Sequence, residues 1–184
     1  MKKLLAGFTV RELLLIAAMA ALGVALKPVV VPLAHLVSTP LMIPSGALTG
    51  GLYMMWLVMA FGLTGKRGAA TLTGFVQAIL VMISGVTGSH GVMSLVSYTM
   101  PGLMIDLIFL LLRRKIDNLP LAVIAGAVAN VTGTTCVNFI FFDLPLIPLL
   151  LSLTVAVFSG GVGGAVSWAL LRLLEQYGIS RRTA

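Results

Sequence analysis

The chain has 184 residues, of which 59% are hydrophobic and 9% are charged, and its formal net charge is +7. A water-soluble globule of this length cannot bury so much apolar surface, so the composition predicts a protein dissolved in a lipid bilayer. A soluble nucleic-acid-binding domain is excluded, because the positive charges are scattered in small groups between apolar stretches; contact with anionic lipid explains them more simply.

Six apolar runs of about 20 residues follow one another along the chain, and each is long enough for a membrane-spanning helix. They cover about residues 12–34, 41–63, 68–87, 92–112, 119–141 and 146–173. Only short segments separate them. The sequence therefore predicts an all-α membrane protein, a compact bundle of six transmembrane helices forming a single domain over residues 1–184.

Basic residues occupy both termini and every second gap between these runs, whereas the gaps around His35, His90 and Asp143 contain no Lys or Arg. The positive-inside rule then places both termini in the cytoplasm. Lys27 departs from the pattern, and we expect its side chain to snorkel outward from the end of the first helix. The basic groups are Lys2, Lys3 and Arg11; Lys66 and Arg67; Arg113, Arg114 and Lys115; and Arg181 and Arg182.

Small residues recur at a four-residue spacing in three of the runs, and prolines are frequent between the first two. Ala17, Ala21 and Ala25 recur at a four-residue period, which predicts a shallow groove that serves either packing within the bundle or contact with a partner protein. The spacings Gly46-xxx-Gly50 and Gly160-xxx-Gly164 are typical of plain helix packing. Four prolines between residues 28 and 44 predict an irregular segment that folds back over the bundle as a lid.

Two polar stripes lie on the fourth and fifth runs at four-residue steps, formed by Ser94, Tyr98, Gly102 and Asp106 and by Asn130, Thr134 and Asn138. A bilayer rejects such faces, so we expect the stripes to face each other or a shared cavity. The helical rise puts Tyr98 and Asn130 at similar depths in the outer half of the membrane. The arrangement indicates a small polar ligand that arrives from outside.

Asp106 is the only carboxylate deep inside a predicted helix, where an ionised group must be paired or hydrogen-bonded. It is either a counter-charge or proton site for a ligand, or a structural acid bonded to Gln77. His90 lies in a glycine-rich outer loop at the expected cavity mouth. Tyr53 and Trp56, one turn apart, either stack on an aromatic ligand or serve only packing.

Known catalytic and metal-binding patterns are missing from the sequence. There is no phosphate-binding loop of an ATPase, no H-E-x-x-H and no G-x-S-x-G. His35, His90 and Cys136 do not have a metal-ligand spacing, and Cys136 is expected to be a packing residue. We therefore expect no enzyme, no cofactor and no metal site.

Six short helices, the alanine ladder, cytoplasmic termini and an outward-facing polar cavity together resemble the substrate-binding S component of energy-coupling factor (ECF) transporters. Residues 65–70 (GKRGAA) and residues 101–109 (PGLMIDLIF), followed by Arg113, look most like the hydroxymethylpyrimidine/thiamine branch. That branch often carries a Gly-x-x-x-Glu pattern in its fourth helix. Gly102 matches the glycine, and Asp106 stands at the acidic position with a shorter side chain.

The resemblance implies a subunit that captures a vitamin or vitamin precursor, thiamine or its hydroxymethylpyrimidine moiety, at the outer face of a prokaryotic cell membrane. It also implies a transmembrane coupling protein and two cytoplasmic ATPases as partners, with Ala17, Ala21 and Ala25 as the coupling surface. The ligand-binding residues expected from the residue patterns are His90, Ser94, Tyr98, Asp106, Asn130, Thr134, Asn138, Tyr53 and Trp56. Two alternatives stay open: a proton-coupled carrier that uses Asp106, and a structural or assembly protein.

Overall fold

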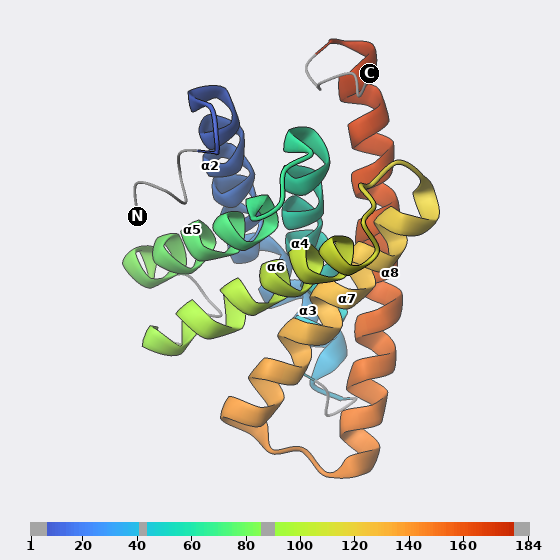
Figure 1. The fold of residues 1–184 in the computed structure, drawn as a ribbon. Helices are drawn as coiled ribbons and strands as arrows, with labels where there is room; N and C mark the ends of the chain where they lie inside the picture. The colour runs from blue at the N-terminus through green and yellow to red at the C-terminus, as the bar shows by residue number, and fades with distance from the viewer. Residues whose placement is uncertain (1–6, 41–43, 86–90, 179–184) are drawn as a thin grey trace.

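The computed structural model describes residues 7–40, 44–85 and 91–178, and this part of the chain is helical throughout, without strands (Figure 1). Nine helical elements follow one another in these described residues. They are α2 (Val10–Ala25), α3 (Lys27–Ser38), α4 (Ser45–Thr64), α5 (Ala69–Ser84), the short η1 (Gly91–Met93), α6 (Ser94–Leu111), α7 (Leu119–Val137), the π-helical η2 (Asn138–Phe142) and α8 (Leu146–Gln176).

The first apolar run is divided into α2 and α3, whose axes differ by 42°. The prediction of an irregular lid after Lys27 is wrong for residues 27–38, which are helical. Pro28 lies in the first turn of α3, where its missing N–H would have no intrahelical acceptor. Pro32 lies inside α3. Proline there removes one backbone hydrogen bond, which is accepted in membrane helices because neighbouring groups can satisfy the freed carbonyl. The prolines therefore shape a bent helix pair.

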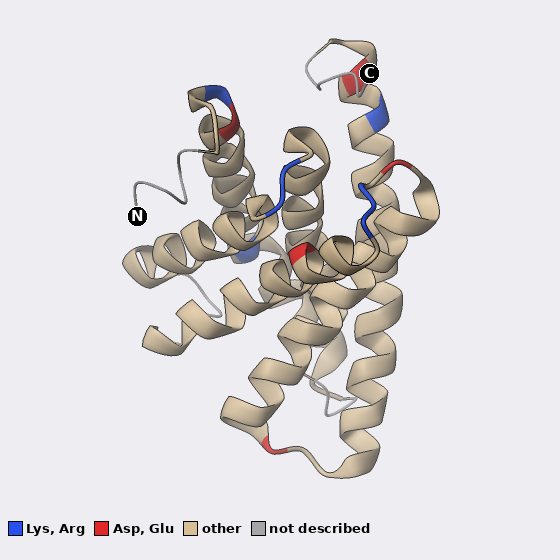
Figure 2. Ribbon diagram, viewed as in Figure 1, with Lys and Arg blue, Asp and Glu red and all other residues tan. Residues whose placement is uncertain are grey.

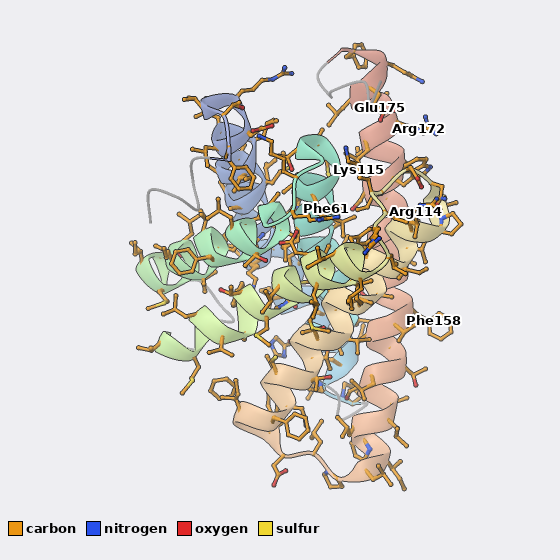
Figure 3. The ribbon with its side chains drawn as sticks, viewed as in Figure 1. Phe61, Arg114, Lys115, Phe158, Arg172 and Glu175 are labelled. Atoms are coloured by element: carbon orange, nitrogen blue, oxygen red, sulfur yellow. The ribbon has the colours of Figure 1, made fainter. Side chains whose placement is uncertain are left out.

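Four of the described helices are long and apolar enough to cross a membrane, and the bent α2–α3 pair raises the number to five. The remaining helix of the bundle, α5, is apolar but has only 16 residues. Large apolar side chains cover the outside of the bundle: Phe158 on α8 is 72% exposed and projects away from it (Figure 3). Such a surface matches a lipid solvent.

The centre of the bundle is α4, which packs against α2, α3, α5, α7 and α8. Its side chains Leu57, Val58 and Phe61 are almost completely buried. The rings of Phe61 and Phe109 lie 5.1 Å apart and tilted, an arrangement that aromatic pairs favour. This apolar core fixes α4 and α6 relative to each other and so positions the side chains nearer the start of α4.

Glycines permit close contact between α7 and α8. A Cβ added to Gly126 would lie 2.2 Å from the carbonyl oxygen of Gly160, and one added to Gly164 would lie 2.1 Å from that of Ala122. No larger residue fits there without separating the helices. The packing role predicted for Gly160-xxx-Gly164 is confirmed by these contacts.

Charged residues gather at one end of the bundle, where α2 begins, α8 ends, and the segments 65–68 and 113–118 connect helices (Figure 2). We call this the basic end. Ion pairs between its described residues include Lys66–Glu12 at 2.7 Å, Arg114–Asp117 at 3.1 Å and Arg172–Glu175 at 3.5 Å. Arg114, Lys115, Arg172 and Glu175 are labelled there in Figure 3.

Candidate functional site

A cavity of about 330 Å³ lies between α3, α4, α6 and α7, near the start of α4 and the end of α7. Because α4 ends and α7 begins at the basic end, the cavity lies toward the opposite end of the bundle. The polar and aromatic residues that line it are Lys27, His35, Ser38, Thr39, Ser45, Tyr53, Ser97, Tyr98, Asn130, Thr134 and Phe142.

Lys27 is the most unusual residue of the cavity wall. Its side chain is not exposed at a helix end, as the snorkelling prediction required, but is 96% buried, since only 4% of it is accessible. The ammonium nitrogen donates a hydrogen bond to the Tyr98 hydroxyl. It also lies 4.6 Å from the centroid of the Tyr53 ring and 4.4 Å from that of Tyr98. Two aromatic faces thus hold one positive charge.

No carboxylate accompanies this ammonium. The whole sequence has five acidic residues, all within the part that the structure describes, namely Glu12, Asp106, Asp117, Asp143 and Glu175. None of them lines the cavity, and none pairs with Lys27. A buried charge without a counter-charge is costly, so an acceptor group brought into the cavity would stabilise the ammonium.

Asn130 and Thr134 both line the cavity, but their polar atoms are used differently. The Asn130 side-chain nitrogen donates to the carbonyl oxygens of Ala47 and Ala156, each at 3.0 Å, and so links α7 to α4 and α8. Its oxygen is packed against Gly50. The Thr134 hydroxyl is buried and has no hydrogen-bond partner among the described residues. The Thr134 hydroxyl is therefore available to a ligand, whereas the Asn130 side-chain nitrogen is not.

The mouth of the cavity is formed by α3 and the start of α4. Ser45 Oγ lies 3.3 Å from His35 Nε2 across this boundary. Below them, the Tyr53 hydroxyl donates to the carbonyl oxygen of Gly46 at 3.2 Å. The Ser45–His35 contact links the proline-containing helix α3 to α4 at one side of the cavity, whereas the Tyr53 bond lies within α4.

Several residues predicted for the site lie away from the cavity lining. Ser94 and Asn138 are buried elsewhere, and the Asn138 side-chain oxygen accepts from the Leu144 backbone nitrogen at 3.0 Å. Trp56 packs against α2: its ring would lie 3.2 Å from a Cβ added to Gly23. Tyr53 and Trp56 therefore do not face the cavity together. His90 lies outside the described residues.

Asp106 is also absent from the cavity wall. One of its oxygens accepts from the backbone nitrogen of Thr71 at 2.8 Å and from the Thr71 hydroxyl at 2.6 Å. Since α5 begins at Ala69, this carboxylate satisfies a backbone donor that the first turn of a helix leaves unpaired. The expected alternative bond to Gln77 is wrong: the side-chain nitrogen of Gln77 has no partner in the described part of the chain.

Gly102 and Asp106 act on the same contact between α5 and α6. A Cβ added to Gly102 would lie 2.3 Å from the carbonyl oxygen of Ala70. The glycine thus lets the start of α5 approach α6, and the acid one turn later binds it. This geometry gives the Gly102-x-x-x-Asp106 pattern a structural role.

The alanine ladder lies on the surface. Ala17, Ala21 and Ala25 are exposed, whereas Ile16, Ala20 and Gly23 on the other face of α2 are buried against the bundle. Packing within the bundle, one of the two expected roles, therefore does not apply to the ladder. The small-residue face is accessible to another transmembrane helix or to lipid.

Sequence reasoning missed Lys27, His35, Ser38 and Ser45 as cavity residues. One signal for Lys27 was present, because a lysine inside an apolar run is expensive in a membrane and usually faces the protein interior. The polar residues of α3 had no such signal once the prolines had predicted an irregular lid.

The family described as "ABC-type cobalt transport system, permease component" matches residues 11–132, which is more than half of the chain. The chain belongs to this family. A solved structure titled "Crystal structure of an S-component of ECF transporter" has the same fold, with a TM-score of 0.79 at 20% sequence identity. The match covers 93% of this chain and 87% of that one. No curated protein matches the sequence.

The cavity of this permease-family protein has few groups that prefer cobalt. Transition-metal sites in proteins use several imidazole, thiolate or carboxylate ligands. Within the described residues, no three His, Cys, Asp or Glu side chains come together as a candidate metal site. The cavity wall instead combines one ammonium with aromatic rings and hydroxyls, which suits an organic ligand better.

Proposed function

We propose that this protein is the substrate-capture subunit of an ECF-type importer. It binds a small organic molecule in the cavity at the outer face of a prokaryotic cell membrane, and partner ATPases drive its uptake. The observation that carries the proposal is a cavity with aromatic and hydrogen-bonding walls, located away from the basic end. The positive-inside rule assigns the basic end to the cytoplasm and so turns the cavity toward the outside.

The partner surface in this proposal is the exposed alanine ladder. Because lipid offers little hydrophobic drive for helix association, close backbone approach over Ala17, Ala21 and Ala25 would stabilise a contact with a transmembrane coupling protein. Two cytoplasmic ATPases would complete the transporter. The capture subunit itself would catalyse no reaction.

Thiamine or its hydroxymethylpyrimidine moiety is the proposed substrate. The cavity volume of about 330 Å³ falls at the small end of the range for ligand pockets. Tyr53, Tyr98, Asn130 and Thr134 form its wall, while Ser94, Trp56, Asp106 and Asn138 support the helices around it. His90 is kept as a residue that closes the mouth, on the sequence argument alone.

The test is to purify the protein alone, identify any co-purified molecule by mass spectrometry, and titrate it by calorimetry. Tight binding without transport in proteoliposomes, and transport once the coupling protein and ATPases are added, would support the proposal. Uptake by the lone protein down a proton gradient would contradict it and would favour a carrier. The carrier alternative is the weaker one, because Asp106 binds Thr71 outside the cavity wall.

A further inference from the structure

We propose that Lys27 determines the specificity of the cavity: it selects ligands that present an anionic or lone-pair-rich acceptor group, and it rejects ligands with a fixed positive charge. This inference rests on the proposed function and concerns the class of its substrate.

The first argument is hydrogen-bonding capacity. An ammonium group has three N–H donors, and Lys27 uses one of them on the Tyr98 hydroxyl. Within the described residues its nitrogen has no second hydrogen bond and no acidic partner. The unused donors belong to a nitrogen in the cavity wall. An acceptor on the ligand would therefore gain a charge-assisted bond, which is about twice as strong as a neutral one.

The second argument is the cost of a second positive charge. A cationic ligand would lie beside a buried ammonium in a space without a carboxylate, and charges repel strongly where water is excluded. The Lys27 nitrogen already occupies one face of the Tyr53 ring and one face of the Tyr98 ring, where a cation would otherwise bind. A fixed cation that used these faces would have to displace it.

The third argument concerns the rest of the wall. Ser38, Ser45 and the Thr134 hydroxyl offer further neutral hydrogen bonds, and Val31, Val137 and Phe142 offer apolar contact. This combination fits a flat, neutral heterocycle with ring nitrogens and a hydroxyl. Of the two proposed substrates, the uncharged hydroxymethylpyrimidine meets this description, and thiamine, with its permanently charged thiazolium ring, does not.

The experiment is calorimetric titration of the purified full chain with hydroxymethylpyrimidine and with thiamine, for the wild type, Lys27→Met and Lys115→Met. Lys115→Met makes the same chemical change at an exposed position of the basic end. We expect the wild type to bind the pyrimidine at least about ten-fold more tightly than thiamine. Lys27→Met should remove that preference, and Lys115→Met should keep it. Melting temperatures of all three proteins would be measured to check that the variants are folded.

Equal or tighter binding of thiamine by the wild type would overturn the role of Lys27, and so would an unchanged preference in Lys27→Met. If the wild type binds neither compound, the proposed substrate is wrong, and the co-purified molecule decides about Lys27. A neutral or anionic molecule that is lost from Lys27→Met would support the inference. A molecule with a fixed positive charge that Lys27→Met retains would overturn it.

Discussion

The two ends of the bundle treat charge in opposite ways. At the basic end, Glu12, Asp117 and Glu175 each pair with a lysine or arginine. In the cavity, Lys27 is buried against two aromatic rings without an acidic partner. Basic residues at a membrane surface orient a protein, and exposed ion pairs there add little to its stability. A buried charged group without a charged partner often marks a binding site. The comparison teaches that most charges lie at the basic end, whereas a single lysine lies in the cavity wall, where the proposed ligand would bind.

Helix α2 connects the two ends and presents the alanine ladder, so a change there should separate capture from transport. We expect Ala21→Leu to abolish complex formation with the coupling protein and ATP-driven uptake, because a bulky side chain prevents close helix approach. Ligand affinity should stay within two-fold of the wild type. Pull-down, uptake and calorimetry measure the three quantities. The control is Val162→Leu, which also enlarges a side chain, at an exposed position of α8. An Ala21→Leu chain that still pulls down the coupling protein would move the interface elsewhere.

Asp106, like the acidic residues of the basic end, has a structural partner, because it binds the first turn of α5. Asp106→Ala should lower the free energy of unfolding by about 2–3 kcal/mol, since two hydrogen bonds to a carboxylate are lost. Ligand affinity should change less than two-fold, because the residue does not line the cavity. Thermal unfolding in detergent and calorimetry check this. Asp117→Ala removes a half-exposed ion pair and should cost less than about 1 kcal/mol; a large loss of affinity in Asp106→Ala would place this acid in the binding site.

For Thr134, in the cavity wall, we expect a loss of ligand affinity without a loss of stability. Its buried hydroxyl has no partner in the described part of the chain, so Thr134→Val should leave stability unchanged or slightly raised. Ligand affinity should fall about five- to ten-fold through the loss of one hydrogen bond. The matched control is Thr154→Val, whose hydroxyl only donates to the Leu150 carbonyl on an exposed face. Equal affinities for Thr134→Val and the wild type would show that the hydroxyl does not touch the ligand.

Sequence periodicity located the parts of the molecule that depend on local spacing. The four-residue steps on the fourth and fifth runs predicted that Tyr98, Asn130 and Thr134 share a space, and the structure brings them to one cavity with Tyr53. The same spacing wrongly extended the stripe to Asp106. Neighbouring residues on one helix face have different environments over two turns when another helix, here α5, begins against part of that face.

Two features could not be read from local patterns. The bond from Thr71 to Asp106 depends on how the start of α5 docks on α6, which is a tertiary contact made possible by Gly102. The burial of Lys27 depends on a helix, α3, that its prolines argued against. In both cases the packing of other helices determined the conformation. Such tertiary contacts often override the helix propensity of the local sequence.

The central claim, a ligand-binding cavity that opens outside the cell and lies opposite a cytoplasmic basic end, can be tested by cysteine labelling in whole cells. Thr39→Cys, at an exposed position of the cavity wall, and Lys115→Cys, at the basic end, are each made in a Cys136→Ala background. A membrane-impermeant maleimide should label Thr39→Cys, hydroxymethylpyrimidine should slow that labelling, and Lys115→Cys should react only after the cells are opened. Labelling of Lys115→Cys in intact cells, with Thr39→Cys protected, would contradict the account.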